Sequence, residues 1–138
     1  MIDFGALNRI GRDVRKGFIP KLDVKLRNRE VHLLSMIQKH PNEPFIFYSE
    51  RLGLERSSFS YMAETLELKG LIIRKNAIDD KRVKYLTLSK KGISITDEIE
   101  RQFQLYLENL LSVLSKKEIS DMDHAVETIK KIMSKIDI

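Results

Sequence analysis

Hydroxyl and charged side chains alternate with apolar ones over residues 56–69, at a spacing suited to recognition of a polyanion. Phe59, Met62 and Leu66 share one face of a predicted helix, which indicates that this face is buried. The side chains left outside can donate hydrogen bonds to phosphate oxygens and base edges, although an ordinary solvated helix face is the alternative. The outward set comprises Arg56, Ser57, Ser58, Ser60, Tyr61 and Glu64.

A second group of charged side chains lies in the polar stretch 76–82. It is flanked by two β-branched or alternating segments, 71–75 and 83–88, which predict a β-hairpin with a long charged tip. A narrow A·T-rich minor groove attracts an inserted guanidinium through its negative potential, so Arg82 could enter one. Pairing of Arg82 with a neighbouring aspartate in solvent is the alternative, and we expect both in part, with Asp80 bracing Arg82. The other cations predicted to meet the same partner are Arg74, Lys81 and Lys84.

Catalytic and metal chemistry are not predicted. The three histidines, His32, His40 and His124, are far apart, there is no cysteine, and no carboxylate stands at metal-ligand spacing. The sequence also lacks a Gly-x-Ser-x-Gly elbow, a phosphate-cradling glycine-rich loop and a His-Glu-x-x-His segment. We therefore expect no enzyme, no metal and no cofactor.

The net charge of +5 over 138 residues is unevenly distributed. Residues 1–28 have seven basic and three acidic side chains, residues 49–92 ten and six, and residues 93–138 six and nine. A positive middle beside a negative tail suggests one surface that meets a polyanion and another that faces away from it. Because no apolar stretch approaches the length of a membrane span, we expect one soluble, cytoplasmic domain.

The segments outside 56–88 are predicted to be helical. Residues 2–26 show three-to-four apolar spacing that Gly17 and Pro20 interrupt. A second helix is expected from Asn28 to His40, and a third, short one over residues 49–52, ended by a glycine. The last third has a further apolar stripe over residues 99–114.

The final helix has the clearest start signal in the chain. Ser115 and Glu118 form a capping box, in which each side chain accepts a hydrogen bond from the other residue's backbone amide. A strict heptad spacing follows, typical of a coiled-coil interface, in Ile119, Met122, Val126, Ile129, Met133 and Ile136, here called the C-terminal seam. Packing within its own core is the alternative, but the leftover apolar faces at both ends favour a homodimer.

Three segments resemble the MarR family of winged helix-turn-helix regulators. They are residues 48–74 (YSERLGLERSSFSYMAETLELKGLIIR), residues 79–83 (DDKRV), similar to the family's Asp-x-Arg wing element, and residues 86–92 (LTLSKKG), similar to its Leu-Thr-x-x-Gly close. The resemblance implies a mainly α fold with a small β-hairpin wing. It implies a single domain over 1–138, with dimerisation helices at 1–28 and 93–138 around a winged helix-turn-helix at 29–92.

The resemblance also implies how the chain works. Residues 56–69 would enter the major groove of double-stranded DNA, and Arg82 the adjacent minor groove. We expect a homodimeric, ligand-responsive transcriptional repressor with a palindromic, A·T-rich operator. A winged-helix module that binds protein is the alternative, which the basic tip at Lys81, Arg82 and Lys84 disfavours. Glu55, Tyr61 and Lys81 depart from the residues usual in the family, which bears on base preference rather than on binding mode.

An effector pocket between the dimerisation helices and the winged helix is a further implication of the resemblance, often for aromatic or phenolic compounds. The sequence does not assign its residues. Tyr48, His32 and Phe18 are apolar-aromatic candidates, with packing in the core as the alternative for each.

Overall fold

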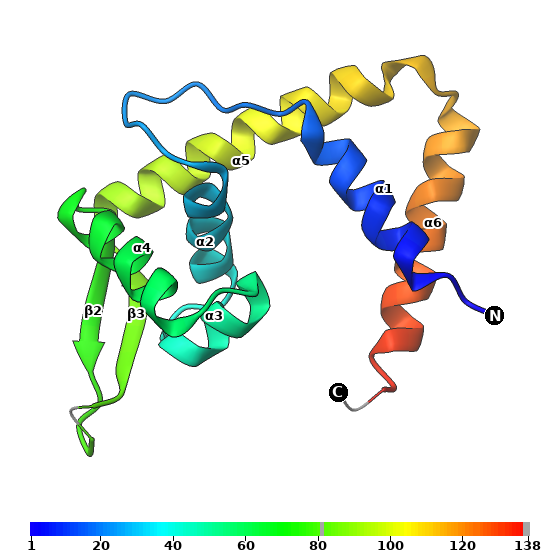
Figure 1. The fold of residues 1–138 in the computed structure, drawn as a ribbon. Coiled ribbons are helices and arrows are strands. Elements are labelled where there is room, and N and C mark those ends of the chain that lie inside the picture. The colour runs from blue at the N-terminus through cyan, green and yellow to red at the C-terminus, as the bar shows by residue number, and fades with distance from the viewer. Residues whose placement is uncertain (81, 137–138) are drawn as a thin grey trace. The chain divides into compact units, whose positions relative to one another are not determined.

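The structure, a computed structural model, describes residues 1–80 and 82–136. The chain divides into two compact units, Met1–Gln102 and Phe103–Ile138. Over the described residues the elements run, in order, α1 (Phe4–Lys16), α2 (Asn28–Lys39), β1 (Glu43–Pro44), α3 (Phe45–Leu52), α4 (Arg56–Leu68), β2 (Ile72–Asn76), β3 (Lys84–Leu88), α5 (Lys90–Leu110), the 3₁₀ turn η1 (Leu111–Val113) and α6 (Lys116–Met133) (Figure 1). The chain is therefore mainly helical with a small sheet, as predicted.

The core of the first unit lies where α2, α3 and α4 meet the sheet (Figure 1). The predicted apolar face of α4 is buried, because Phe59, Met62 and Leu66 are all nearly inaccessible to solvent. Opposite them, α2 contributes Leu33 and Ile37, which are fully buried. The packing of α4 on this core leaves its other face outside.

Tyr48, one of the aromatic candidates for an effector pocket, is a core residue of α3. Its side chain is fully buried, and its hydroxyl donates to the backbone carbonyl oxygen of His40 at 2.5 Å. The same hydroxyl accepts from the backbone amide of Glu43 at 3.2 Å. Burial raises the pKa of this phenol, so the hydroxyl remains protonated and available as a donor.

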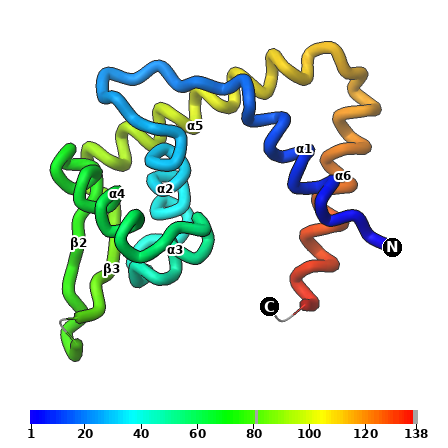
Figure 2. Tube along the Cα trace, viewed as in Figure 1, coloured from blue at the N-terminus to red at the C-terminus, as the bar shows by residue number. Residues whose placement is uncertain are grey.

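The sheet has three antiparallel strands in the order β1-β3-β2. Strands β2 and β3 form the predicted hairpin, in which Ile72 lies opposite Leu88 and Asn76 opposite Lys84. Figure 2 shows the hairpin extending away from the neighbouring helices. The short β1 was not predicted. Two residues, one of them proline, have no alternation that could indicate a strand, so β1 exists only through its pairing with β3.

Helix α3 begins at Phe45, four residues earlier than the prediction of a helix over residues 49–52. Pro44 precedes it in an extended conformation. Proline has no backbone N–H and cannot donate a helical hydrogen bond, so it suits the position just before a helix. The apolar run 45–48 is helical because it packs on the core. Gly53 ends α3 in the left-handed region, at φ 64°, as the sequence predicts.

The start of α5 packs tightly against the turn that follows α4. Ser89 Oγ accepts from the backbone amide of Gly92 at 3.0 Å and donates to the carbonyl oxygen of Gly70 at 2.5 Å. The backbone of Gly92 lies so close to Leu71 that a Cβ on Gly92 would overlap the Leu71 carbonyl oxygen. The glycine at position 92 is therefore required by this close approach.

The N-terminal helix is shorter than the predicted segment 2–26, because α1 ends at Lys16 with Gly17 as its C-cap. Beyond it, the chain is held to α5 by reciprocal hydrogen bonds of Lys21 and Gln102. The Lys21 amide donates to Gln102 Oε1 and Gln102 Nε2 donates to the Lys21 carbonyl oxygen, both at 2.8 Å.

The second unit contains the end of α5, η1 and α6. The capping box is present, since Glu118 N donates to Ser115 Oγ at 3.1 Å and Ser115 N donates to Glu118 Oε1 at 3.2 Å. Over the 18 residues of α6, all of them described, no side chain is buried. Within the chain itself, the C-terminal seam is thus left open.

Candidate nucleic-acid interface

The outward face of α4 presents most of the residues predicted from the sequence. Arg56, Ser57, Ser58, Tyr61 and Glu64 are exposed, and Tyr61 retains 65% of its accessible surface. Ser60 is half-buried at the edge of this face. Hydroxyls, one guanidinium and one carboxylate therefore share a surface that is free to approach a partner.

A bidentate ion pair fixes α4 against the sheet. Arg74 on β2 donates to both carboxylate oxygens of Glu67, from Nε at 2.9 Å and from Nη2 at 2.8 Å. These hydrogen bonds lower the pKa of Glu67 and raise that of Arg74. Arg74, which the sequence predicts as a DNA contact, is half-buried, and its guanidinium is directed to Glu67, so it ties α4 to the hairpin.

The hairpin tip carries the predicted pairing of Arg82 with Asp80. Asp80 Oδ1 accepts from the Arg82 amide at 3.0 Å and from its Nε at 3.2 Å, and Asp80 Oδ2 accepts from Nη2 at 3.4 Å. These contacts lower the pKa of Asp80. The Arg82 side chain is nonetheless 91% exposed, and Lys84 is exposed too, whereas Lys81 lies outside the described residues. The aspartate thus restrains the arginine without covering it.

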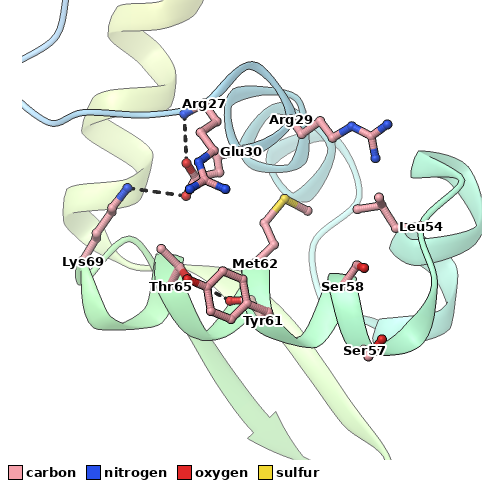
Figure 3. A pocket seen from close by; sticks show the side chains of 10 residues that line it. All are labelled: Arg27, Arg29, Glu30, Leu54, Ser57, Ser58, Tyr61, Met62, Thr65 and Lys69. Carbon is pink, nitrogen blue, oxygen red and sulfur yellow. Dashed lines mark hydrogen bonds and ion pairs between the residues drawn. The ribbon is translucent and has the colours of Figure 1, made fainter.

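A hollow of about 530 Å³ lies between the start of α2 and the outward face of α4 (Figure 3). This α2–α4 groove is lined by Arg27, Arg29, Glu30, Leu54, Ser57, Ser58, Tyr61, Met62, Thr65 and Lys69. Its three cations were missed by the sequence prediction. The available signal for Arg27 and Arg29 was a local excess of positive charge, since Lys25, Arg27 and Arg29 stand close together around the start of α2.

The structure also places the residues considered for other chemistry. His32 lies on the exposed side of α2, where partial burial and the charges of Arg15 and Lys39 lower its pKa. Phe18 is half-buried.

Over residues 1–80 and 82–136, no three histidine, aspartate or glutamate side chains are arranged to hold a metal ion. In the same residues, no helix is both long and apolar enough to span a membrane.

A short helix followed by a second helix with an exposed face, and then a β-hairpin with an exposed arginine, define a winged helix-turn-helix DNA-binding protein. A model of the MarR family matches residues 26–84. The HTH-type transcriptional regulator MhqR of Bacillus subtilis (strain 168) is 26% identical over 107 residues, which cover 78% of this chain and 72% of that protein. Residues 26–84, the winged helix-turn-helix part of the chain, match the MarR family, and both similarities support a DNA-binding regulator of transcription.

Solved structures agree on the fold over nearly the whole chain. Wild-type MarR from E. coli in the apo form has a TM-score of 0.70 at 17% identity, covering 94% of this chain and 98% of that one. Streptococcus pneumoniae FabT in complex with DNA has a TM-score of 0.68 at 23% identity, covering 97% and 92%. The Streptomyces coelicolor regulator PcaV with its natural ligand has a TM-score of 0.61 at 15% identity, covering 95% and 96%.

Proposed function

We propose that the chain is a homodimeric repressor, acting in the cytoplasm, that reads a palindromic, A·T-rich operator. In this proposal α4 enters the major groove and the hairpin tip enters the adjacent minor groove. The observation that carries it is the joint exposure of the α4 hydroxyls and the Arg82 guanidinium on one compact unit, with α4 tied to the hairpin by Arg74 and Glu67. The fold similarity to a protein solved on DNA supports the same assignment.

Dimerisation is proposed through the helices at both ends of the chain, residues 1–28 and 93–138, around the winged helix-turn-helix of 29–92. Neither α1 nor α6 buries a residue within the chain, and Phe4, Ile10 and Val126 each keep more than half of their surface exposed. Apolar faces of this kind are stabilised when a second copy covers them. Two recognition helices related by a two-fold axis would contact half-sites about 10 bp apart, centre to centre.

We further propose that a small molecule adjusts the affinity for DNA, because a neighbour of the same fold was solved with its natural ligand. An effector shifts the population of a dimer only by binding its two states with different affinities. The residues that would bind the effector are not assigned.

Substitutions on α4 are expected to change which DNA is preferred. Tyr61→Ala and Ser60→Ala should weaken binding to the operator more than binding to random DNA, because outward hydroxyls near base edges contribute to sequence readout. Fluorescence anisotropy with the two duplexes measures this ratio. An equal loss on both duplexes would make these residues phosphate contacts instead.

Substitution of Arg82 tests the proposed entry of the wing into the minor groove. Arg82→Ala should lower affinity for the operator by about 1 to 3 kcal/mol, comparable to one good base contact. Arg82→Lys should recover only part of the loss, because an ammonium is more strongly hydrated and costs more to strip of water in a narrow groove.

The measurement for Arg82 uses two operators that differ only in minor-groove A·T content, titrated at several salt concentrations. The wild-type chain should favour the operator richer in A·T, and Arg82→Ala should lose that preference. If the variant keeps the preference and its log-log salt slope flattens by about 0.9, Arg82 contacts one phosphate and the wing is a nonspecific clamp.

A further inference from the structure

We propose that the α2–α4 groove seats the sugar-phosphate backbone of one DNA strand beside α4, with Arg27 and Arg29 as phosphate contacts. This inference rests on the proposed function, since it takes α4 as the helix that enters the major groove. It adds a third contact region, at the start of α2, to the α4 face and the hairpin tip.

The α2–α4 groove lies directly beside the outward face of α4. One wall of the groove is formed by Ser57, Ser58 and Tyr61, which belong to the outward face of α4 (Figure 3). The opposite wall carries Arg27 and Arg29 at the start of α2. The major groove of B-DNA is about 12 Å wide, so a helix inserted there lies between two phosphate-bearing strands. With α4 in the major groove, Arg27 and Arg29 on the opposite wall of the hollow would therefore face the phosphates of one DNA strand.

The charge of the groove depends on the ion pair and hydrogen bonds of the Glu30 carboxylate. This carboxylate is only 3% exposed, and it accepts from the Arg27 backbone amide at 2.8 Å and from Lys69 Nζ at 3.4 Å. Lys69 Nζ also donates to the Lys25 carbonyl oxygen at 2.7 Å. The one carboxylate in the groove and the Lys69 ammonium thus compensate each other, and both are held in place.

Two guanidinium groups remain uncompensated. Over residues 1–80 and 82–136, neither Arg27 nor Arg29 takes part in an ion pair, and both residues are exposed. Guanidinium groups bind phosphate oxygens well, because their planar set of donors matches the geometry of the anion. The hydroxyls of Ser57 and Ser58 on the facing wall are further phosphate donors. A negatively charged backbone suits this lining better than an apolar ligand.

The test measures DNA affinity of the full chain over a series of salt concentrations, for wild type, Arg27→Ala, Arg29→Ala and the double variant. The probes are a short duplex selected by the wild type from a random pool and a scrambled duplex of the same length. Lys39→Ala is the matched control, because it removes one exposed cation at the other end of α2, outside the groove. Circular dichroism confirms that each variant is folded.

Each single arginine variant should bind the selected and the scrambled duplex more weakly by the same factor. The log-log salt slope should flatten by about 0.9 for each arginine removed and by about twice that in the double variant. Lys39→Ala should keep the slope of the wild type. Replacing chloride with inorganic phosphate at equal ionic strength should affect wild type and Arg29→Ala alike.

Three results would overturn the inference. The slopes of Arg27→Ala and Arg29→Ala could equal that of Lys39→Ala, or the variants could lose the preference for the selected duplex, which would indicate base contacts. Inorganic phosphate could also weaken DNA binding by the wild type alone, which would make the groove a site for a small anion. Failure of the proposed function has a different signature, namely that the wild type binds the selected and the scrambled duplex equally.

Discussion

Gly92→Ala is expected to lower the free energy of unfolding by about 3 kcal/mol or more. The added Cβ would overlap the carbonyl oxygen of Leu71 and lie 3.0 Å from its carbonyl carbon, and both are backbone atoms that cannot rotate away. Relief requires α5 to move from the turn after α4, which breaks the hydrogen bonds of Ser89 with Gly70 and Gly92. Urea denaturation followed by circular dichroism measures the change.

Gly11→Ala is the matched control, because it makes the same chemical change inside another helix. The nearest atom to its added Cβ is Arg15 Nη1, the mobile end of a side chain, at 3.6 Å. Helix propensity then favours alanine by up to about 1 kcal/mol, so this variant should be no less stable than the wild type. Equal stability of Gly92→Ala and the wild type would show that α5 does not approach Leu71 as described.

Ile129→Asp is expected to convert the proposed dimer into a monomer, because the carboxylate would be buried without a partner at the centre of the C-terminal seam. The cost should be several kcal/mol of dimer stability. In the isolated chain Ile129 is 39% exposed, so the substitution leaves the fold of one protomer intact. Light scattering at micromolar concentration measures the mass, and circular dichroism should remain that of a folded helical protein.

His124→Asp controls for the added charge. His124 lies on the same helix but, by heptad position, on the face opposite the C-terminal seam. This variant should stay dimeric and bind DNA as the wild type does. A wild type that is already monomeric at micromolar concentration, or an Ile129→Asp variant that stays dimeric, would place the interface elsewhere.

Elements with strong local signals were predictable from the sequence. The buried face of α4 follows from apolar spacing, the end of α3 from Gly53, and the start of α6 from the hydrogen-bonding capacity of Ser115 and Glu118. The pairing of Asp80 with Arg82 was predictable too, since two residues on one hairpin tip are neighbours whatever the rest of the chain does.

Features that depend on contacts distant in sequence were not predictable. Strand β1 exists through its pairing with β3, and α3 starts early because Phe45 finds a place in the core. The pairing of Arg74 with Glu67 was not visible in the sequence, because it depends on the turn after α4 that places the two residues side by side. The α2–α4 groove joins residues 27–30 to residues 54–69, and no pattern within either segment indicates the other.

Sequence-specific recognition of double-stranded DNA by α4 and the hairpin of a homodimer is tested most directly by selection of duplexes from a random pool with the wild-type chain. Affinity for the selected duplex and for its scramble is then compared at one salt concentration. We expect the selected duplex to contain an inverted repeat with half-sites about 10 bp apart, bound at least roughly 10³-fold more tightly than the scramble. Enrichment of no common sequence, with equal affinity for both duplexes, would contradict it.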